Sequence, residues 1–342
     1  MRTRGSRAAF GCDRVVTNIS FALLLVLVTV LARPSHAAQC RDYEIQANSG
    51  APAPLEGNPT HKDLVDAVAW TMRHKLALPL PAALRVYFCA DGAALVEELS
   101  QIASSSGPEA WWSSAAAVAM EGGVVFRDDR LAQMQPATRA GLMAHELTHV
   151  SQLKLMAGTR VGPPLWLLEG HAEWVRLKVL GLLELRTEPA SRAEIAEPIV
   201  GSKDVAKRFP DLRMLESQGP WLAQLGRIGD AGTYGQAFLA VDWLIERYGS
   251  SALLKFLGQF GSHASNPREL WRRSFPISYD YFVDDFGTHL MKKISRSRPV
   301  SGGCRMTCDR YGSNAISRRS GISDGELPQS APVGSGSLGF PA

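Results

Sequence analysis

Two short stretches decide the fold: Ala144-His145-Glu146-Leu147-Thr148-His149 and Trp166-Leu167-Leu168-Glu169-Gly170-His171-Ala172-Glu173-Trp174. His145 and His149 are four residues apart, so on a helix they lie on one face and can reach the same ion. The second stretch supplies two carboxylates, Glu169 and Glu173, one helix further along the chain. Together the two stretches predict a mononuclear zinc site built on consecutive helices.

The setting of the two histidines argues against a chance pattern on a solvated helix. Apolar residues stand around them, and burying polar side chains without partners is unfavourable. Two neutral imidazoles and one carboxylate leave a bound zinc ion positive, which lowers the pKa of water from about 15.7 toward roughly 7. Glu146 lies about 100° round the helix from His145, so it can face that water and take its proton without binding the ion.

Composition excludes one class of partner. The chain has 342 residues, 45% hydrophobic and 20% charged, so it can bury a core as one large domain or two small ones. Its formal charge is +4, but residues 1–37 hold five arginines and one aspartate, and 32 basic and 32 acidic residues remain without them. No clustered basic surface is visible in the sequence, so we expect no nucleic-acid partner.

The N-terminal residues have the pattern of a secretory signal. An arginine-containing lead precedes the apolar run Phe21–Ala32, and Ser35-His36-Ala37 offers small residues where a signal peptidase cuts, so residues 1–37 are the predicted signal peptide. The alternative is an uncleaved anchor that would associate the protein with a membrane. Twelve apolar residues are short for a span, which needs about 20. We expect an exported protein, periplasmic or secreted.

Export changes the interpretation of the cysteines. Cys12 leaves with the signal, and an even number remains, which suits two disulfides with three possible connectivities. The predicted pairs are Cys40–Cys89 and Cys304–Cys308, since each joins neighbouring segments. Half a metal site is the alternative for Cys304 and Cys308, but no second pair follows them.

Periodicity predicts a sheet-containing part at 38–135 and a helical part at 136–296 that carries the zinc site. Thr60 and Asp63 form a predicted capping box at a helix start, and alternating Leu84, Val86 and Phe88 predict a strand. In the first part we also expect a loop from Cys40 to Pro59, a helix from about Gly92 and a strand at Gly122–Asp128. In the second part we expect a helix from Pro136 to Gly158 and another that begins at Pro163-Pro164. From about Thr233 the chain is expected to be helical throughout, with the first of these helices ending at Gly249 and N-caps at Ser250, Asn266 and Ser278. Residues 297–342 are rich in Ser, Gly and Arg with few large apolar side chains, so we expect disorder there.

The motif His145-Glu-Leu-Thr-His149, followed by Pro164-Leu-Trp-Leu-Leu-Glu-Gly-His-Ala-Glu-Trp174, resembles the gluzincins, in particular aminopeptidase N-like and related bacterial envelope zinc peptidases. In that family about eighteen residues separate HExxH from a Trp-Leu-x-Glu-Gly-x-Ala segment; here nineteen separate His149 from Glu169. The resemblance implies that Glu169 is the third zinc ligand. It also implies that Glu173 supports a ligating histidine, and that His171 is a bystander.

Two further segments resemble the same family, within roughly residues 120–260. Tyr234-Gly-Gln-Ala-Phe238 is similar to a later helix whose tyrosine donates a hydrogen bond to the oxyanion. Tyr234 also lies on an apolar stripe, and a core position is the alternative. Ala119-Met120-Glu121-Gly122-Gly123 resembles a Gly-Ala-Met-Glu-Asn segment whose glutamate holds a substrate amine. The simpler interpretation of Glu121 is a polar residue that opens an edge strand.

The sequence thus predicts an α+β, zincin-like fold, with a small sheet packed on helices and a mostly helical C-terminal half. The expected function is zinc-dependent hydrolysis of peptide or protein substrates, with Glu146 as general base. One alternative is a scaffold that keeps its metal for stability, with the fourth coordination position filled by His171 or Glu173. Another is an envelope-assembly factor that acts through residues 297–342.

Overall fold

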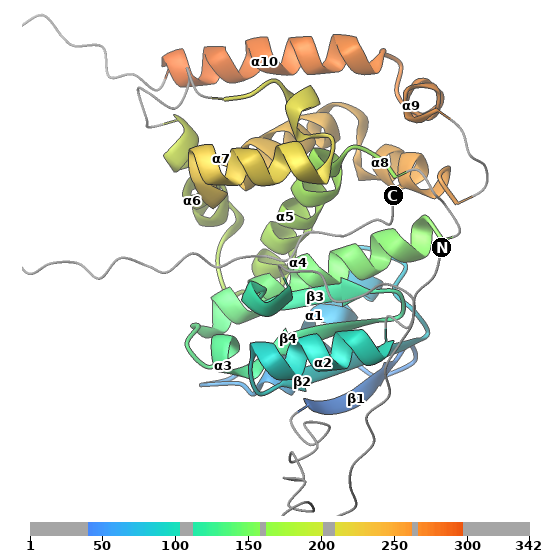
Figure 1. Ribbon diagram of the computed structural model, residues 1–342, viewed down its shortest axis with the longest axis vertical. Helices are drawn as coiled ribbons and strands as arrows, with labels where there is room; N and C mark the ends of the chain where they lie inside the picture. Colours follow the sequence, from blue (N-terminus) through green and yellow to red (C-terminus); the bar gives the residue numbers. More distant parts are fainter. Residues whose placement is uncertain (1–39, 103–111, 158–161, 201–208, 262–265, 297–342) are drawn as a thin grey trace, which may run out of the picture. The chain divides into compact units, whose positions relative to one another are not determined.

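The computed structural model describes residues 40–102, 112–157, 162–200, 209–261 and 266–296 (Figure 1). All of them belong to one compact unit, Ala37–Ala342. The predicted signal peptide, the predicted tail and the Cys304–Cys308 pair lie outside the described residues. Among the described helices, none is long and apolar enough to cross a membrane.

The α+β fold class is confirmed, because a four-stranded mixed sheet packs on helices. After Pro136 the described residues form helices and turns without a strand. The elements in chain order are β1 Cys40–Gln46, α1 His61–His74, β2 Ala83–Cys89, α2 Gly92–Ile102, a 3-10 turn Trp112–Ser114, β3 Ala117–Met120, β4 Gly123–Arg127, α3 Asp128–Leu131, α4 Pro136–Leu155, α5 Leu165–Leu182, α6 Glu188–Val200, a 3-10 turn Leu212–Leu215, α7 Gln218–Tyr248, α8 Ser250–Gly258, α9 Pro267–Ser274 and α10 Tyr279–Arg296.

The sheet has the strand order β1-β2-β4-β3. The two central strands, β2 and β4, are parallel, and each edge strand runs antiparallel to its neighbour. Cys40 of β1 stands directly opposite Cys89 of β2. The predicted disulfide between these two residues is confirmed, and it joins the edge strand to the centre of the sheet.

The central strand β2 is buried on both faces because successive side chains point to opposite sides. Leu84, Val86 and Phe88 pack in the core that contains α1 and α4. Tyr87 and Cys89 pack in a smaller core with α2. The strand predicted from this alternation is therefore confirmed, and α4 is held against the first of the two faces (Figure 1).

The predicted helix ends are largely confirmed. The Thr60 hydroxyl accepts a hydrogen bond from the Asp63 backbone at 3.1 Å, and the Asp63 carboxylate accepts one from the Thr60 backbone at 3.0 Å, which completes the capping box of α1. Gly249 ends α7 with a φ of +79°, a conformation that favours glycine. Asn266 caps α9 through its side chain. Ser250 is the first residue of α8 rather than its N-cap, which is Gly249.

Other expectations are wrong. The segment after Cys40 is not all loop, since Cys40–Gln46 forms the edge strand β1, whose largely exposed, charged side chains hide its alternation. The four-residue strand β3 was too short to expect from sequence. Helix α7 begins at Gln218, well before Thr233, and is interrupted at Gly229, which has a φ of +73°.

The C-terminal half is organised by the packing of α5 between α4 and α7 (Figure 1). Gly170 of α5 allows the close approach, because a Cβ at this position would collide with the backbone carbonyl of Ala237 on α7. At the other end of the core, aromatic rings from α5 to α10 pack together. This C-terminal aromatic cluster consists of Trp166, Trp243, Phe256, Trp271, Phe275, Tyr279, Phe282 and Phe286.

Candidate metal centre

Helix α4 is buried along most of its length, which makes its polar side chains unusual. Arg139 through Gln152 are all buried. Apolar residues of α4 face the sheet and α1, whereas His145 and His149 face α5, where Glu169 and Glu173 lie. His145 is 2% exposed, and His149 and Glu169 are fully buried. Such groups are stable in an interior only when they satisfy one another or hold an ion.

Three ligand atoms meet at this interface. His145 Nε2 lies 3.1 Å from His149 Nε2, and Glu169 Oε2 lies 3.3 Å from the first nitrogen and 3.5 Å from the second. Ligands bonded at 2.0–2.1 Å to a tetrahedral ion lie about 3.3–3.4 Å apart, so the triangle has the size of a coordination site. These three residues could therefore hold a metal ion.

The hydrogen-bond inventory of Glu169 supports that fit. Both of its carboxylate oxygens are buried without a hydrogen-bond partner of normal geometry among the described residues. A buried carboxylate left in this state is costly unless a cation neutralises it. A cation between the Glu169 carboxylate and the two imidazoles would thus satisfy all three groups.

Each imidazole is held in its orientation by a hydrogen bond from Nδ1, the ring nitrogen that faces away from the triangle. His145 Nδ1 donates to Glu173 Oε1 at 2.8 Å, and His149 Nδ1 donates to Gln152 Oε1 at 2.8 Å. The amide of Gln152 donates to the carbonyl of Leu168 at 2.9 Å, which fixes which end of the amide faces His149. With Nδ1 carrying the proton, Nε2 of each histidine presents a lone pair to the centre of the triangle.

Gln152 and Arg176 belong to this arrangement and were missed in the sequence. Arg176 donates to Glu173 Oε2 at 2.7 Å, so the carboxylate is held on one side by Arg176 and on the other by His145. Each missed residue stands three positions after its partner, at a spacing that brings side chains together on a helix. That spacing is the signal that could have found them.

The pKa values at the centre follow from burial and neighbouring charges. Burial favours neutral His145, but the carboxylates of Glu169 and Glu173 outweigh it and raise the pKa of His145 to about 10. Burial also opposes charge on Glu169, yet His149 and His145 lower its pKa to about 2. Protons and a metal ion compete for the same lone pairs, so metal binding here releases protons.

Glu146 is buried beside the triangle without belonging to it. Burial raises its pKa to about 7, although His145, His149 and the Ala119 backbone N–H act in the opposite direction. Neither carboxylate oxygen has a hydrogen-bond partner of normal geometry in the part of the chain that is described. A carboxyl group that titrates near neutral pH can accept a proton from a nearby donor and release it again.

The structure brings Tyr234 to the site from α7. Its ring meets the His145 ring edge-on with a centroid separation of 6.0 Å, and it meets Trp221 at 5.1 Å. His145, Glu173 and Tyr234 line a cavity of about 440 Å³ that does not reach Glu146. Tyr234 is therefore compatible with both interpretations: its ring packs in the core, and it also lines a cavity next to His145.

Two residues considered in the sequence stand apart from the centre. His171 is fully buried against Gln152, 3.2 Å from its amide nitrogen, and burial lowers its pKa to about 3. It is not among the three residues whose ligand atoms converge. Glu121 is exposed in the turn between β3 and β4 and does not line the cavity.

Searches of known protein families, curated proteins and solved structures find no match for this chain.

Proposed function

We propose that this protein is a zinc-dependent hydrolase of peptide bonds. The observation that carries the proposal is the triangle of His145, His149 and Glu169, with an uncommitted buried carboxylate, Glu146, beside it. Two imidazoles and one carboxylate are a donor set of catalytic zinc, which keeps its fourth position for water or substrate. The gluzincin resemblance of the motif leads to the same reaction class.

In this hydrolysis each residue of the site would have a separate role. Zinc, when bound, polarises a substrate carbonyl and makes water acidic enough to attack at neutral pH. Glu146 accepts the proton of the attacking water, for which a pKa of about 7 is well matched. Glu173 and Gln152 hold the two imidazoles in the ligating tautomer. Tyr234 supplies a hydroxyl donor to the oxyanion from the neighbouring helix.

The hydrolase accounts for the site better than a structural metal scaffold. A structural zinc site is closed by four protein ligands. Here Glu173 is engaged with His145 and Arg176, and His171 lies against Gln152, so neither candidate for a fourth ligand is available. A structural site also has no use for Glu146, whose burial without a well-formed hydrogen bond among the described residues is costly.

The proposal includes export to an oxidising compartment and a peptide or protein substrate. Its support is the signal-like pattern of residues 1–37 together with the disulfide between Cys40 and Cys89. Disulfides form and persist mainly outside the cytosol. A location in the periplasm or outside the cell is therefore compatible with the proposed zinc peptidase activity.

The test replaces the proposed base without touching the ligands. Glu146→Gln is expected to bind one zinc per chain and to cleave peptides at least about 100-fold more slowly than wild type, since general-base catalysis contributes roughly 10²–10⁴-fold. Metal analysis and a mass-spectrometric digest of a peptide library give the two readouts. Glu56→Gln, the same chemical change at an exposed position, is the matched control and should keep full activity.

Two results would count against the proposal. If Glu146→Gln binds zinc and cleaves peptides as fast as wild type, Glu146 is not the base. If wild type holds one zinc per chain and cleaves nothing in the library, the scaffold becomes the better account of the site.

A further inference from the structure

The cavity beside the metal centre has a mixed lining that suggests what it binds. Its volume is about 440 Å³, within the range of ligand pockets. Helices α4, α5, α6 and α7 all contribute to its wall. Leu142 of α4 and Ile195 of α6, together with Met134, provide apolar surface, whereas three carboxylates and the guanidinium of Arg176 provide the charge.

Three carboxylates line this cavity, and two of them already have partners. Glu173 is held by His145 and Arg176, and Glu194 forms an ion pair with Arg186. Asp230 has neither an ion pair nor a hydrogen bond among the described residues, although it is half-buried. Burial raises the pKa of Asp230, and no cation among the described residues counters this effect.

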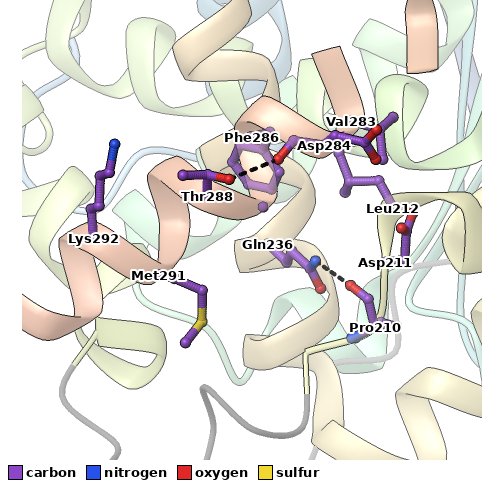
Figure 2. A pocket seen from close by; sticks show the side chains of 11 residues that line it. Pro210, Asp211, Leu212, Gln236, Val283, Asp284, Phe286, Thr288, Met291 and Lys292 are labelled. Atoms are coloured by element: carbon purple, nitrogen blue, oxygen red, sulfur yellow. Dashed lines mark hydrogen bonds between the residues drawn. The ribbon is translucent and has the colours of Figure 1, made fainter. Parts of the chain in front are cut away.

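A second cavity, of about 720 Å³ between α7, α10 and residues 210–212, shows the contrast (Figure 2). It also has two carboxylates in its wall, Asp211 and Asp284. Both of them accept hydrogen bonds from Arg213, at 2.7 and 3.0 Å. Both carboxylates in the wall of that cavity are thus paired within the protein, whereas Asp230 has no such partner in the described part of the chain.

The backbone places Asp230 at a defined distance from the site. Gly229, with its positive φ, interrupts α7, and the helix resumes at Asp230. Tyr234, whose ring contacts His145, follows four residues later on the same face, so the Cα atoms of Asp230 and Tyr234 are about one helical turn apart, roughly 6 Å along the axis. A substrate group that reaches Asp230 from a bond held at the metal centre must be long.

We propose that this cavity binds a basic side chain of the peptide substrate and that Asp230 determines this specificity, an inference that rests on the proposed peptidase function. The aliphatic stem of a lysine or arginine lies along Leu142 and Ile195, and its cationic end pairs with Asp230. Long cationic side chains commonly bury their stems on apolar surface in this way. An N-terminal ammonium, directly next to the first peptide bond, is too close to that bond to span the same helical turn.

The test measures binding without turnover, on the full chain loaded with zinc and carrying Glu146→Gln. Pentapeptides Ac-Ala-Ala-X-Ala-Ala-NH2, with X as lysine, arginine, norleucine or glutamate, are titrated by calorimetry. The lysine and arginine peptides should bind about tenfold more tightly than the norleucine peptide, as expected for one charge-assisted hydrogen bond. The glutamate peptide should bind most weakly.

Asp230→Asn in the same background should remove the preference for lysine over norleucine. Glu246→Gln, which removes one exposed charge from the same helix outside the cavity, should leave the preference intact. Equal binding of the lysine and norleucine peptides by the parent protein, or an unchanged preference after Asp230→Asn, overturns the proposal. So does an uncapped norleucine peptide that binds as tightly as the capped lysine peptide, because the cation would then be a terminal amine.

Failure of this proposal is distinguishable from failure of the peptidase. The binding preference is measured on a variant that lacks the base, and it does not depend on cleavage. Cleavage of a peptide library by wild type without selection for lysine or arginine overturns the specificity and leaves the hydrolase in place. A library that stays intact while the lysine peptide binds selectively overturns the hydrolase alone.

Discussion

The metal centre and the C-terminal aromatic cluster are both buried, and both are built on α5. Trp166, near the start of α5, packs against Trp271 and Phe282 in the cluster. Glu169, one turn later on the same helix, faces His145 and His149. Burying rings stabilises the fold, whereas burying charges costs stability unless they are matched. One helix thus carries a region that stabilises the fold and a region whose buried charges require partners or an ion.

The largest effect is expected in the aromatic cluster. Trp271 is fully buried and contacts five other rings. Trp271→Ala should lower the free energy of unfolding by about 3–5 kcal/mol, because a large cavity replaces the indole. Urea unfolding measures this change. A loss below 1 kcal/mol would mean that the cluster does not stabilise the fold as the comparison requires.

The next largest effect is expected from metal removal, which should act at the candidate metal centre and not in the aromatic cluster. With zinc held at about 100 times its dissociation constant, chelation should lower the stability of wild type by about 2.7 kcal/mol. His149→Ala should lose this zinc-dependent difference, since one ligand is gone. His171→Ala, also a buried histidine truncated to alanine, should keep it. A chelation effect that survives in His149→Ala would mean that the ion binds elsewhere.

A smaller effect is expected behind the ligands. Glu173→Ala removes the acceptor of His145 Nδ1, and zinc affinity should fall about 10–100-fold, the usual range when such a partner is lost. Competition with a fluorescent chelator measures it. Lys178→Ala, on the same helix and paired with Glu188 away from the site, is the control. Unchanged affinity in Glu173→Ala would show that the imidazole is oriented by packing alone.

The smallest effect lies outside both regions and gives the baseline. Thr60→Ala at the cap of α1 should cost about 1 kcal/mol at neutral pH and leave zinc binding unchanged.

Hydrogen bonds from Thr60 lower the pKa of Asp63. A carboxyl with a lowered pKa stabilises the fold above its unfolded pKa, and this stabilisation disappears as pH falls through the folded value. The difference between wild type and Asp63→Asn should therefore shrink in acid, and a difference that grows would contradict the sign.

How much the sequence could predict depends on how local each feature is. The facing pair His145 and His149 needs only helical spacing, and the capping box of Thr60 needs only four consecutive residues. Both follow from short-range geometry. The pairing of Cys40 with Cys89 was one of three connectivities, and the register of β1 against β2 decides it.

What the sequence could not predict depends on packing between distant segments. The resemblance implied a place for Tyr234 at the site, but short-range geometry could not: its contact with His145 requires α7 to pack close to α5, and the collision that a Cβ on Gly170 would cause shows how close the two helices are. The lack of a cationic partner for Asp230 among the described residues depends on where the cations of distant segments lie. The edge strands β1 and β3 are short or mostly exposed on one face, so their alternation is too weak to stand out.

The order of the ligands along the chain has a consequence for folding kinetics. All three ligand atoms come from α4 and α5, which follow one another directly, whereas Tyr234 and Asp230 arrive with the later helix α7. Contacts that are near in sequence form early, since little loop entropy opposes them. If the proposed ion binds, we therefore expect the α4–α5 pair to bind it before the cavity wall is complete, so that the ion stabilises this pair while the rest of the chain docks.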